Sequence, residues 1–175
     1  MAKKIAIIVV VLIVGLLGFA ATRPDTMRVE RSTRINASPE KIYPHIADFH
    51  GWAAWSPFEG RDPAMKRTYS GAPSGKGAVY EYEGNSDVGQ GRMEIIETSP
   101  PGKITIQLDF IKPFAARNTA EFTLAPSGDT TTVTWAMHGP QSFFAKVMCI
   151  FVDMDSMIGK DFEDGLAKLK TLAEQ

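Results

Sequence analysis

Residues 104–110 read ITIQLDF, a strict alternation of apolar and polar side chains that is typical of a β-strand. Successive side chains of a strand point to opposite faces of its sheet. The apolar side chains from Ile104 to Phe110 therefore share one face, and the polar ones from Thr105 to Asp109 share the other. Because one face is apolar, this segment predicts an antiparallel sheet that packs against a second layer.

The chain on both sides carries further strand patterns at the spacing of an antiparallel meander. Each is rich in β-branched or aromatic residues and is bounded by Gly, Pro, Ser, Asn or Asp. The last of them repeats the alternation, because Val133, Trp135 and Met137 share one face. The predicted strands besides residues 104–110 are residues 27–35, 65–69, 78–82, 91–97, 116–124 and 131–138.

Two helices are expected beside this sheet. Ser38 and Pro39 suit the N-cap and first turn of a short helix, in which Ile42 and Ile46 recur at helical spacing. Residues 143–154 are too apolar for an ordinary surface loop, and we expect them to form core or a lid. A long amphipathic helix then closes the chain and offers the sheet an apolar cover. Its apolar stripe consists of Ile158, Phe162, Leu166, Leu169 and Leu172.

The N-terminus has the composition of a membrane segment. The uncharged run at residues 5–22 would span roughly 27 Å as a helix, against about 30 Å for a hydrocarbon core. This run exceeds the usual core of a cleaved signal, which favours a retained single-pass helix over a signal peptide. Both interpretations place the rest of the chain outside the cytoplasm, in the periplasm. Lys3 and Lys4 favour that orientation, whereas the arginines from Arg23 to Arg34 oppose it.

The chain is therefore expected to divide into an N-terminal anchor or signal, residues 1–24, and a domain, residues 25–175. Residues 25–175 are long enough to form one domain with a hydrophobic core. A formal net charge of −1 gives no field toward nucleic acid. No cluster of Lys and Arg interleaves with aromatic residues either, so we expect no nucleic-acid partner.

The residues that commonly bind metals are sparse. Cys149 is the only cysteine, which excludes an internal disulfide and a cage of thiolate ligands. His45, His50 and His138 lie on separate predicted elements without the spacing of a zinc motif. We therefore expect no metal site and no cofactor.

Local motifs carry a resemblance to a known family. They are residues 37–43 (ASPEKIY), residues 48–57 (DFHGWAAWSP, which fits D-F-x-x-W-x-x-W-S-P) and residues 75–80 (GKGAVY), the last followed by Gly84, Asn85, Gly91 and Met93. From about Met27 to Gln175 the chain resembles the SRPBCC superfamily, which includes START domains and Bet v 1-like proteins. It is most similar to bacterial polyketide cyclase/dehydrase-like members, here with an N-terminal membrane helix. These motifs are structural, so the resemblance assigns no catalytic residue.

The resemblance implies an α+β helix-grip fold, in which a curved antiparallel sheet of about seven strands wraps around the long C-terminal helix. Sheet and helix enclose an apolar cavity in such a fold, whereas the alternative is a solid core without room for a ligand. Strand alternation and the helical stripe then select the residues of the concave face. The candidate ligand-binding residues are Tyr80, Tyr82, Met93, Leu108, Phe110, Phe122, Trp135, Met137, Met157, Phe162 and Leu166.

The first functional hypothesis is a membrane-tethered domain that binds a hydrophobic or amphipathic small molecule, such as a lipid or an aromatic, polyketide-like metabolite. The second is an enzyme of cyclase or dehydratase type, with His138, Asp153 and Asp155 as candidates for proton transfer. Both aspartates also suit the N-terminus of the last helix, which is the simpler interpretation. The third is a module that binds a membrane or a protein through residues 143–151. The sequence does not indicate an oligomeric state.

Overall fold

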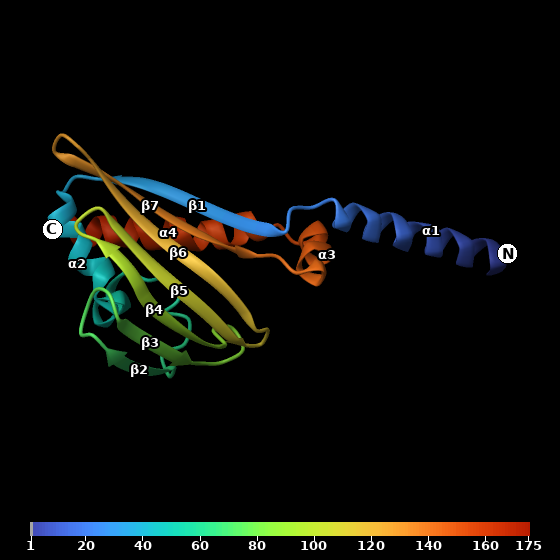
Figure 1. The fold of residues 1–175 in the computed structure, drawn as a ribbon, viewed down its shortest axis with the longest axis horizontal. Helices are drawn as coiled ribbons and strands as arrows, with labels where there is room; N and C mark the ends of the chain where they lie inside the picture. The colour runs from blue at the N-terminus through green and yellow to red at the C-terminus, as the bar shows by residue number, and fades with distance from the viewer. Residues whose placement is uncertain (1) are drawn as a thin grey trace.

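The strands predicted from the sequence form a single curved sheet around a long C-terminal helix (Figure 1). The computed structural model describes residues 2–175. The strands are β1 (Thr26–Ile35), β2 (Lys66–Gly71), β3 (Ala78–Glu83), β4 (Gln90–Ser99), β5 (Lys103–Lys112), β6 (Ala116–Ser127) and β7 (Thr130–Pro140). Their spatial order is β1-β7-β6-β5-β4-β3-β2, so only β1 departs from a meander, and all pairs are antiparallel. The predicted α+β helix-grip fold is confirmed.

The helices lie on one side of this sheet or beyond its edge (Figure 1). They are α1 (Ala2–Ala21), α2 (Pro39–Ala47), the 3-10 helix η1 (Phe49–Ala54), α3 (Phe143–Phe151) and α4 (Met154–Ala173). Ser38 stands at the N-cap of α2, but its side chain accepts no capping hydrogen bond. The predicted position of this cap is therefore right.

A bulge bends the sheet. The register of β4 against β5 shifts between Ile95 and Glu97. An extra residue in one strand bends that strand and increases its twist. Ile95 is fully buried, whereas the adjacent Ile96 is exposed on the outer surface. The bend helps the sheet to curve around α4.

Aromatic and branched side chains fill one half of the space between the sheet and α4. We call this the distal half, because it lies at the end of the sheet away from α1 (Figure 1). It contains the fully buried side chains of Ile35, Ile42, Ile46, Trp55, Ile104, Ile106, Phe122, Val133, Leu166 and Leu169. The Trp55 indole also donates a hydrogen bond to the His45 carbonyl at 3.0 Å, which ties the loop after η1 to α2. We call the other half, next to α1, the proximal half.

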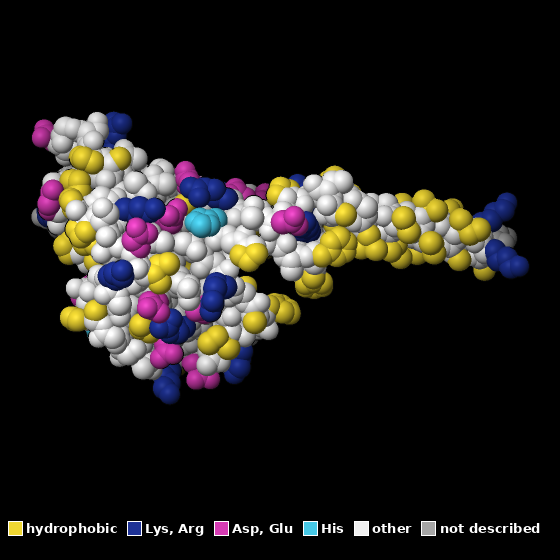
Figure 2. All heavy atoms as spheres, in the orientation of Figure 1, with side chains coloured by type: hydrophobic (Ala, Val, Ile, Leu, Met, Phe, Trp, Pro, Cys, Tyr) yellow, Lys and Arg dark blue, Asp and Glu magenta, His cyan; other side chains and the backbone are white. Residues whose placement is uncertain are grey.

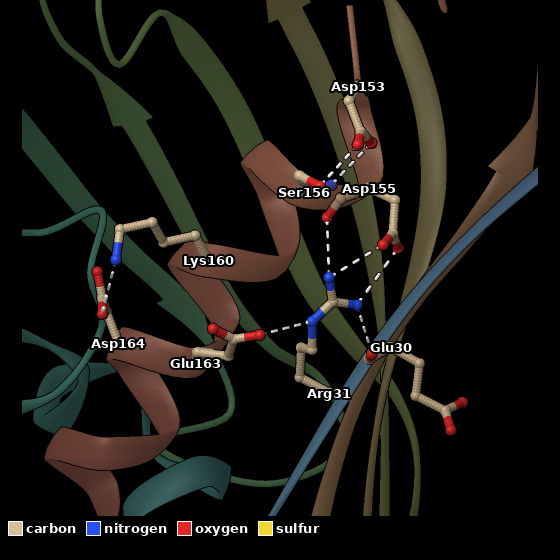
Figure 3. A network of polar contacts seen from close by, with 8 residues as sticks. All are labelled: Glu30, Arg31, Asp153, Asp155, Ser156, Lys160, Glu163 and Asp164. Carbon is tan, nitrogen blue, oxygen red and sulfur yellow. Dashed lines mark hydrogen bonds and ion pairs between the residues drawn. The ribbon is translucent and has the colours of Figure 1, made fainter.

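Ion pairs hold the first turns of α4 against β1 (Figure 3). Arg31 of β1 donates to the Glu163 carboxylate at 2.8 Å and to the Asp155 carboxylate at 3.0 Å. The guanidinium lies directly over Gly159, where an added Cβ would come within 2.0 Å of an Arg31 nitrogen. The hydrogen bonds that Arg31 donates to Asp155 and Glu163 raise the pKa of its guanidinium. These ion pairs fasten the proximal end of α4 to the sheet, together with the stacking of Phe162 on Trp135.

The N-terminal helix projects away from the domain as a separate rod (Figure 1). Among the described residues, α1 is the one helix that is long and apolar enough to cross a membrane. A signal sequence near the N-terminus would meet the same criterion. Of its side chains, that of Ala20 in the last turn is buried, and the others are almost all exposed.

Candidate functional site

The proximal half is hollow. A cavity of about 390 Å³ lies between the sheet and the first turns of α4, and it opens to solvent on one side. This volume falls in the range of small-molecule sites, about 300–1,000 Å³. Residues that line the cavity and are also exposed mark its rim, namely Arg61, Asp87 and Met157. The solid core that the sequence left open as an alternative is thus restricted to the distal half.

Most of the predicted concave-face residues line this cavity. Strand alternation brings side chains from several strands to one wall, and the first turns of α4 form the opposite wall. The predicted residues found there are Tyr80, Tyr82, Met93, Leu108, Phe110, Trp135, Met137, Met157 and Phe162. The Trp135 and Phe162 rings stack with centroids 4.0 Å apart and join the two walls. That these residues bind a ligand remains a prediction.

Two predicted residues, Phe122 and Leu166, lie outside the lining. Phe122 is fully buried and stacks on Trp135 with ring centroids 5.0 Å apart. Trp55 packs edge-on against the same Phe122 ring at 6.0 Å, so no free volume remains beside it. Leu166 lies one turn beyond Phe162 along α4 and is almost fully buried in the core. Both side chains face inward, as predicted, but they belong to the packed distal half.

Further apolar residues that the sequence interpretation did not select complete the wall. They come from β1, η1, β6, the loops and the start of α4, and Ile158 among them belongs to the predicted helical stripe although it was not chosen as a candidate. They are Met27, Trp52, Phe58, Met65, Val88, Ala120, Met154 and Ile158. The methionines among them give this wall unbranched, adaptable side chains.

A buried charged cluster interrupts the apolar wall. The Tyr80 hydroxyl donates to the Glu59 carboxylate at 2.5 Å. Arg67 donates to the other oxygen of that carboxylate at 2.7 Å. Burial, together with the hydrogen bond to Glu59, raises the pKa of Tyr80 well above its ordinary value. The cluster therefore holds a carboxylate and a neutral phenol side by side at the cavity wall.

The sequence interpretation missed Glu59. This residue follows the Trp-Ser-Pro motif in an irregular loop, where no periodic pattern indicates which side chains are buried. Its side chain is only 6% exposed. A carboxylate that follows an aromatic-rich motif by a few residues was the only available signal.

Two other polar groups of the lining are poorly satisfied. The Trp135 indole nitrogen is buried and has no hydrogen-bond partner within residues 2–175. Asn118 donates to the Met137 sulfur at 3.8 Å, and a thioether is a weak acceptor. Buried polar groups normally have good partners, so these two leave unused hydrogen-bonding capacity next to the cavity.

The side chains considered for proton transfer lie away from the cavity lining. His138 lies on the outer face of β7, 3.6 Å from the Glu121 carboxylate. Asp153 caps α4 by accepting from the Ser156 amide at 3.0 Å, and the hydrogen bonds from Ser156 lower the pKa of this carboxyl. Asp155 pairs with Arg31 (Figure 3). The simpler interpretation of the two aspartates, charges at a helix N-terminus, is the correct one.

Residues 143–154 do not form core. Residues 143–151 make helix α3, whose large apolar side chains are mostly exposed. Of this stretch, Met154 reaches the cavity lining, whereas Met148 lies on the surface. Among residues 2–175, no group of three or more His, Cys, Asp or Glu side chains is arranged to hold a metal ion.

A family model described as polyketide cyclase/dehydrase and lipid transport matches residues 26–174. No curated protein matches the chain in sequence. Among solved structures, protein CV1439 from Chromobacterium violaceum is 17% identical with a TM-score of 0.59, and the match covers 87% of this chain and 99% of that chain.

Two further solved structures have the same fold. The Aha1 dimer from Colwellia psychrerythraea is 17% identical with a TM-score of 0.60, and the match covers 85% of this chain and 96% of that one. DynU16, a protein in the dynemicin biosynthetic locus, is 16% identical with a TM-score of 0.59, and the match covers 87% and 48% of the two chains. At such identities, these likenesses establish the fold alone.

Proposed function

The chain belongs to the polyketide cyclase/dehydrase and lipid transport family, and from this premise we propose that it binds a hydrophobic or amphipathic small molecule in the proximal cavity. The observation that carries the proposal is a space of about 390 Å³ with an apolar wall and one charged cluster. A ligand that buries about 300 Å² of apolar surface there would gain roughly 7 kcal/mol before the costs of association. Micromolar binding requires about 8 kcal/mol after those costs, so polar contacts must add to this apolar gain.

Glu59 favours an amphipathic ligand over a pure hydrocarbon. Its carboxylate lines the cavity and is already balanced by Arg67, so a ligand needs to bring no charge. Carboxylates have several lone pairs, and a ligand hydroxyl or amide could donate to one that Tyr80 and Arg67 leave free. A few polar groups in an apolar pocket commonly fix the orientation of the ligand. We therefore assign Glu59 this orienting role.

The proposal includes a membrane tether. In it, residues 1–24 anchor the chain through α1 as a single span, and residues 25–175 form a binding domain outside the cytoplasm, in the periplasm. The length and composition of α1 support this arrangement. Lys3 and Lys4 before the apolar run support the orientation.

Cavity filling tests the binding proposal. Full-length protein is purified in detergent, denatured and extracted, and the extract is examined by mass spectrometry for co-purified small molecules. Leu108→Trp places a large ring in the cavity, whereas Ile96→Trp places the same ring on the outer surface. We expect the extracted compound to be depleted from Leu108→Trp and retained by Ile96→Trp. Equal amounts in both folded variants would refute binding in this cavity.

One observation also favours the second candidate, an enzyme of cyclase or dehydratase type in the same cavity. The hydrogen-bonded Glu59 and Tyr80 are a carboxylate and a phenol at the cavity wall, which is a combination able to move a proton. If the extracted compound is converted on incubation with the protein, Glu59→Gln should abolish the conversion while the compound still binds. Conversion at an undiminished rate would remove Glu59 from any such role.

A further inference from the structure

Helix α3 has its polarity reversed relative to a helix on the surface of a soluble domain. Its buried side chain is that of Lys146, which is only 6% exposed. By contrast, Phe144 is 64% exposed and Phe151 is 68% exposed, and Phe143 and Met148 are exposed as well. A helix in water normally turns its apolar side inward. The exposed side of α3 is therefore unusually apolar for a surface in contact with water.

The position of α3 indicates what this apolar side faces. α3 packs against α1, and Ala20 in the last turn of α1 is fully buried. The Lys146 ammonium pairs with the Asp25 carboxylate at 2.5 Å. The Gln141 backbone N–H donates to the Asp25 backbone carbonyl at 2.7 Å. Asp25 immediately precedes β1, so these contacts fix α3 at the point where α1 joins the domain. If α1 crosses a bilayer, α3 lies at the bilayer surface.

A second exposed apolar segment lies at the same end of the domain. Phe114, between β5 and β6, is 74% exposed, and Ile111 near the end of β5 is also exposed. In Figure 1 the connection between β5 and β6 points toward the side from which α1 leaves. Figure 2 shows hydrophobic side chains continuing from α1 onto the surface around α3. Met157 at the cavity rim is also exposed, and it follows α3 closely in the sequence.

We propose that α3 and Phe114 form a docking surface that inserts into the interfacial layer of the bilayer crossed by α1. Short helices with an exposed apolar side bind in this way, with the side chains reaching about 5–10 Å into the headgroup and acyl boundary. The covalent connection through Asp25 already brings this layer to α3, whereas a soluble partner protein would have to displace it. The inference rests on the membrane tether of the proposed function.

Spin labels on the full chain test the docking. Cys149→Ala first removes the native cysteine, and single cysteines then replace Phe144, Leu12 or Asp129. Each labelled protein is reconstituted in phosphatidylcholine nanodiscs, and collisions of the label with oxygen and with a water-soluble nickel chelate are measured. Leu12 lies in the middle of α1, and Asp129 is exposed in the turn between β6 and β7 at the distal end. A label that replaces Phe151 on the same helix repeats the test.

We expect the ratio of oxygen to nickel collisions at Phe144 and Phe151 to be several-fold higher than at Asp129 and to approach that at Leu12. If Leu12 lies in the bilayer while Phe144 and Phe151 behave like Asp129, the docking is refuted and the tether stands. If both collision rates fall at Phe144, a protein covers α3, which also refutes the docking. If Leu12 itself is in water, the tether fails and the docking with it, whereas the extraction experiment on the cavity is unaffected.

Discussion

The distal and proximal halves of the domain are built from the same strands and the same helix, yet one is solid and the other hollow. In the distal half, Trp55 and the neighbouring isoleucines fill the space between the sheet and α4. In the proximal half, methionine and aromatic side chains surround about 390 Å³ of empty volume. Polar contacts fasten α4 to the first strand in both halves, through Arg31 in the proximal half and through Lys170, which donates to the Arg34 carbonyl, in the distal half.

This difference teaches that dense packing and the cavity that we propose to bind a ligand occupy separate parts of one sheet. A cavity forfeits dispersion contacts along its wall, so a domain that keeps one needs dense packing elsewhere. The distal half supplies it. Substitutions in the distal half should accordingly reduce stability, whereas substitutions in the proximal half should mainly reduce the amount of bound ligand.

The largest effect is expected for Trp55→Ala in the distal half. Trp55 is completely buried and its indole nitrogen is hydrogen-bonded, so its removal should lower the free energy of unfolding by about 3–5 kcal/mol. Denaturant unfolding of the full chain in detergent measures this loss. A loss no larger than that of a cavity-lining substitution would contradict the division into two halves.

Gly165→Ala should have the next largest effect, because this residue lies where α4 meets the boundary between the halves. An added Cβ would come within 2.9 Å of both Pro57 and the Trp135 ring. Overpacking costs about 1–3 kcal/mol, and the better helix propensity of Ala returns up to about 1 kcal/mol. We expect a net loss in unfolding experiments. Gly51→Ala, whose Cβ would meet no atom within 4 Å, is the control and should leave stability unchanged.

Acid should loosen the first turn of α4 through the protonation of Asp153. Hydrogen bonds from Ser156 lower the pKa of Asp153 below its ordinary value of 3.8. The stabilisation that the Asp153 carboxylate gives to α4 is therefore present above pH 3.8 and is lost as the pH falls through the lowered pKa. Hydrogen exchange, corrected for intrinsic rates, should show lost protection near Ser156 but not at Leu169. Asp153→Asn caps without titrating, so an acid-dependent loss that persists in this variant would exclude Asp153 as the cause.

The smallest effect on stability is expected for Met157→Ala at the cavity rim. Met157 is 53% exposed, so the loss should stay below about 0.5 kcal/mol. The same change widens the cavity opening and removes a lining side chain, and we expect less of the extracted compound per protein. A large loss of stability with an unchanged amount of bound compound would contradict the assignment of stability to the distal half and of binding to the proximal half.

Periodicity in the sequence predicted the strands and their inward faces well. Side chains such as Tyr80 and Met93 lie on facing positions of paired strands and reach the same cavity. Periodicity could not tell which inward side chains meet empty space. Phe110 and Phe122 both face inward, but Trp52 and Trp55, which come from η1 and the loop after it, fill the space beside Phe122 only. That packing depends on chain segments without a repeating pattern.

The sequence interpretation missed Glu59 and gave an exposed, binding helix α3 only as one of several alternatives, for different physical reasons. Glu59 is buried in an irregular loop. Its hydrogen-bond partners Arg67 and Tyr80 come from two strands that follow this loop in the sequence. Helix α3 was expected to be core or a lid because apolar composition normally means burial within protein. Composition alone does not distinguish a protein interior from a lipid surface.

The connection between α1 and the sheet has a consequence for transport. Only Thr22 to Asp25 separate the two elements, and fully extended they would reach roughly 14 Å. Asp25 is in addition held by Gln141 and Lys146. If α1 stays in a membrane, as we propose, this short connection keeps the domain at that membrane and prevents it from crossing an aqueous gap. Under the same proposal, a ligand would have to enter and leave the cavity at the membrane that holds α1.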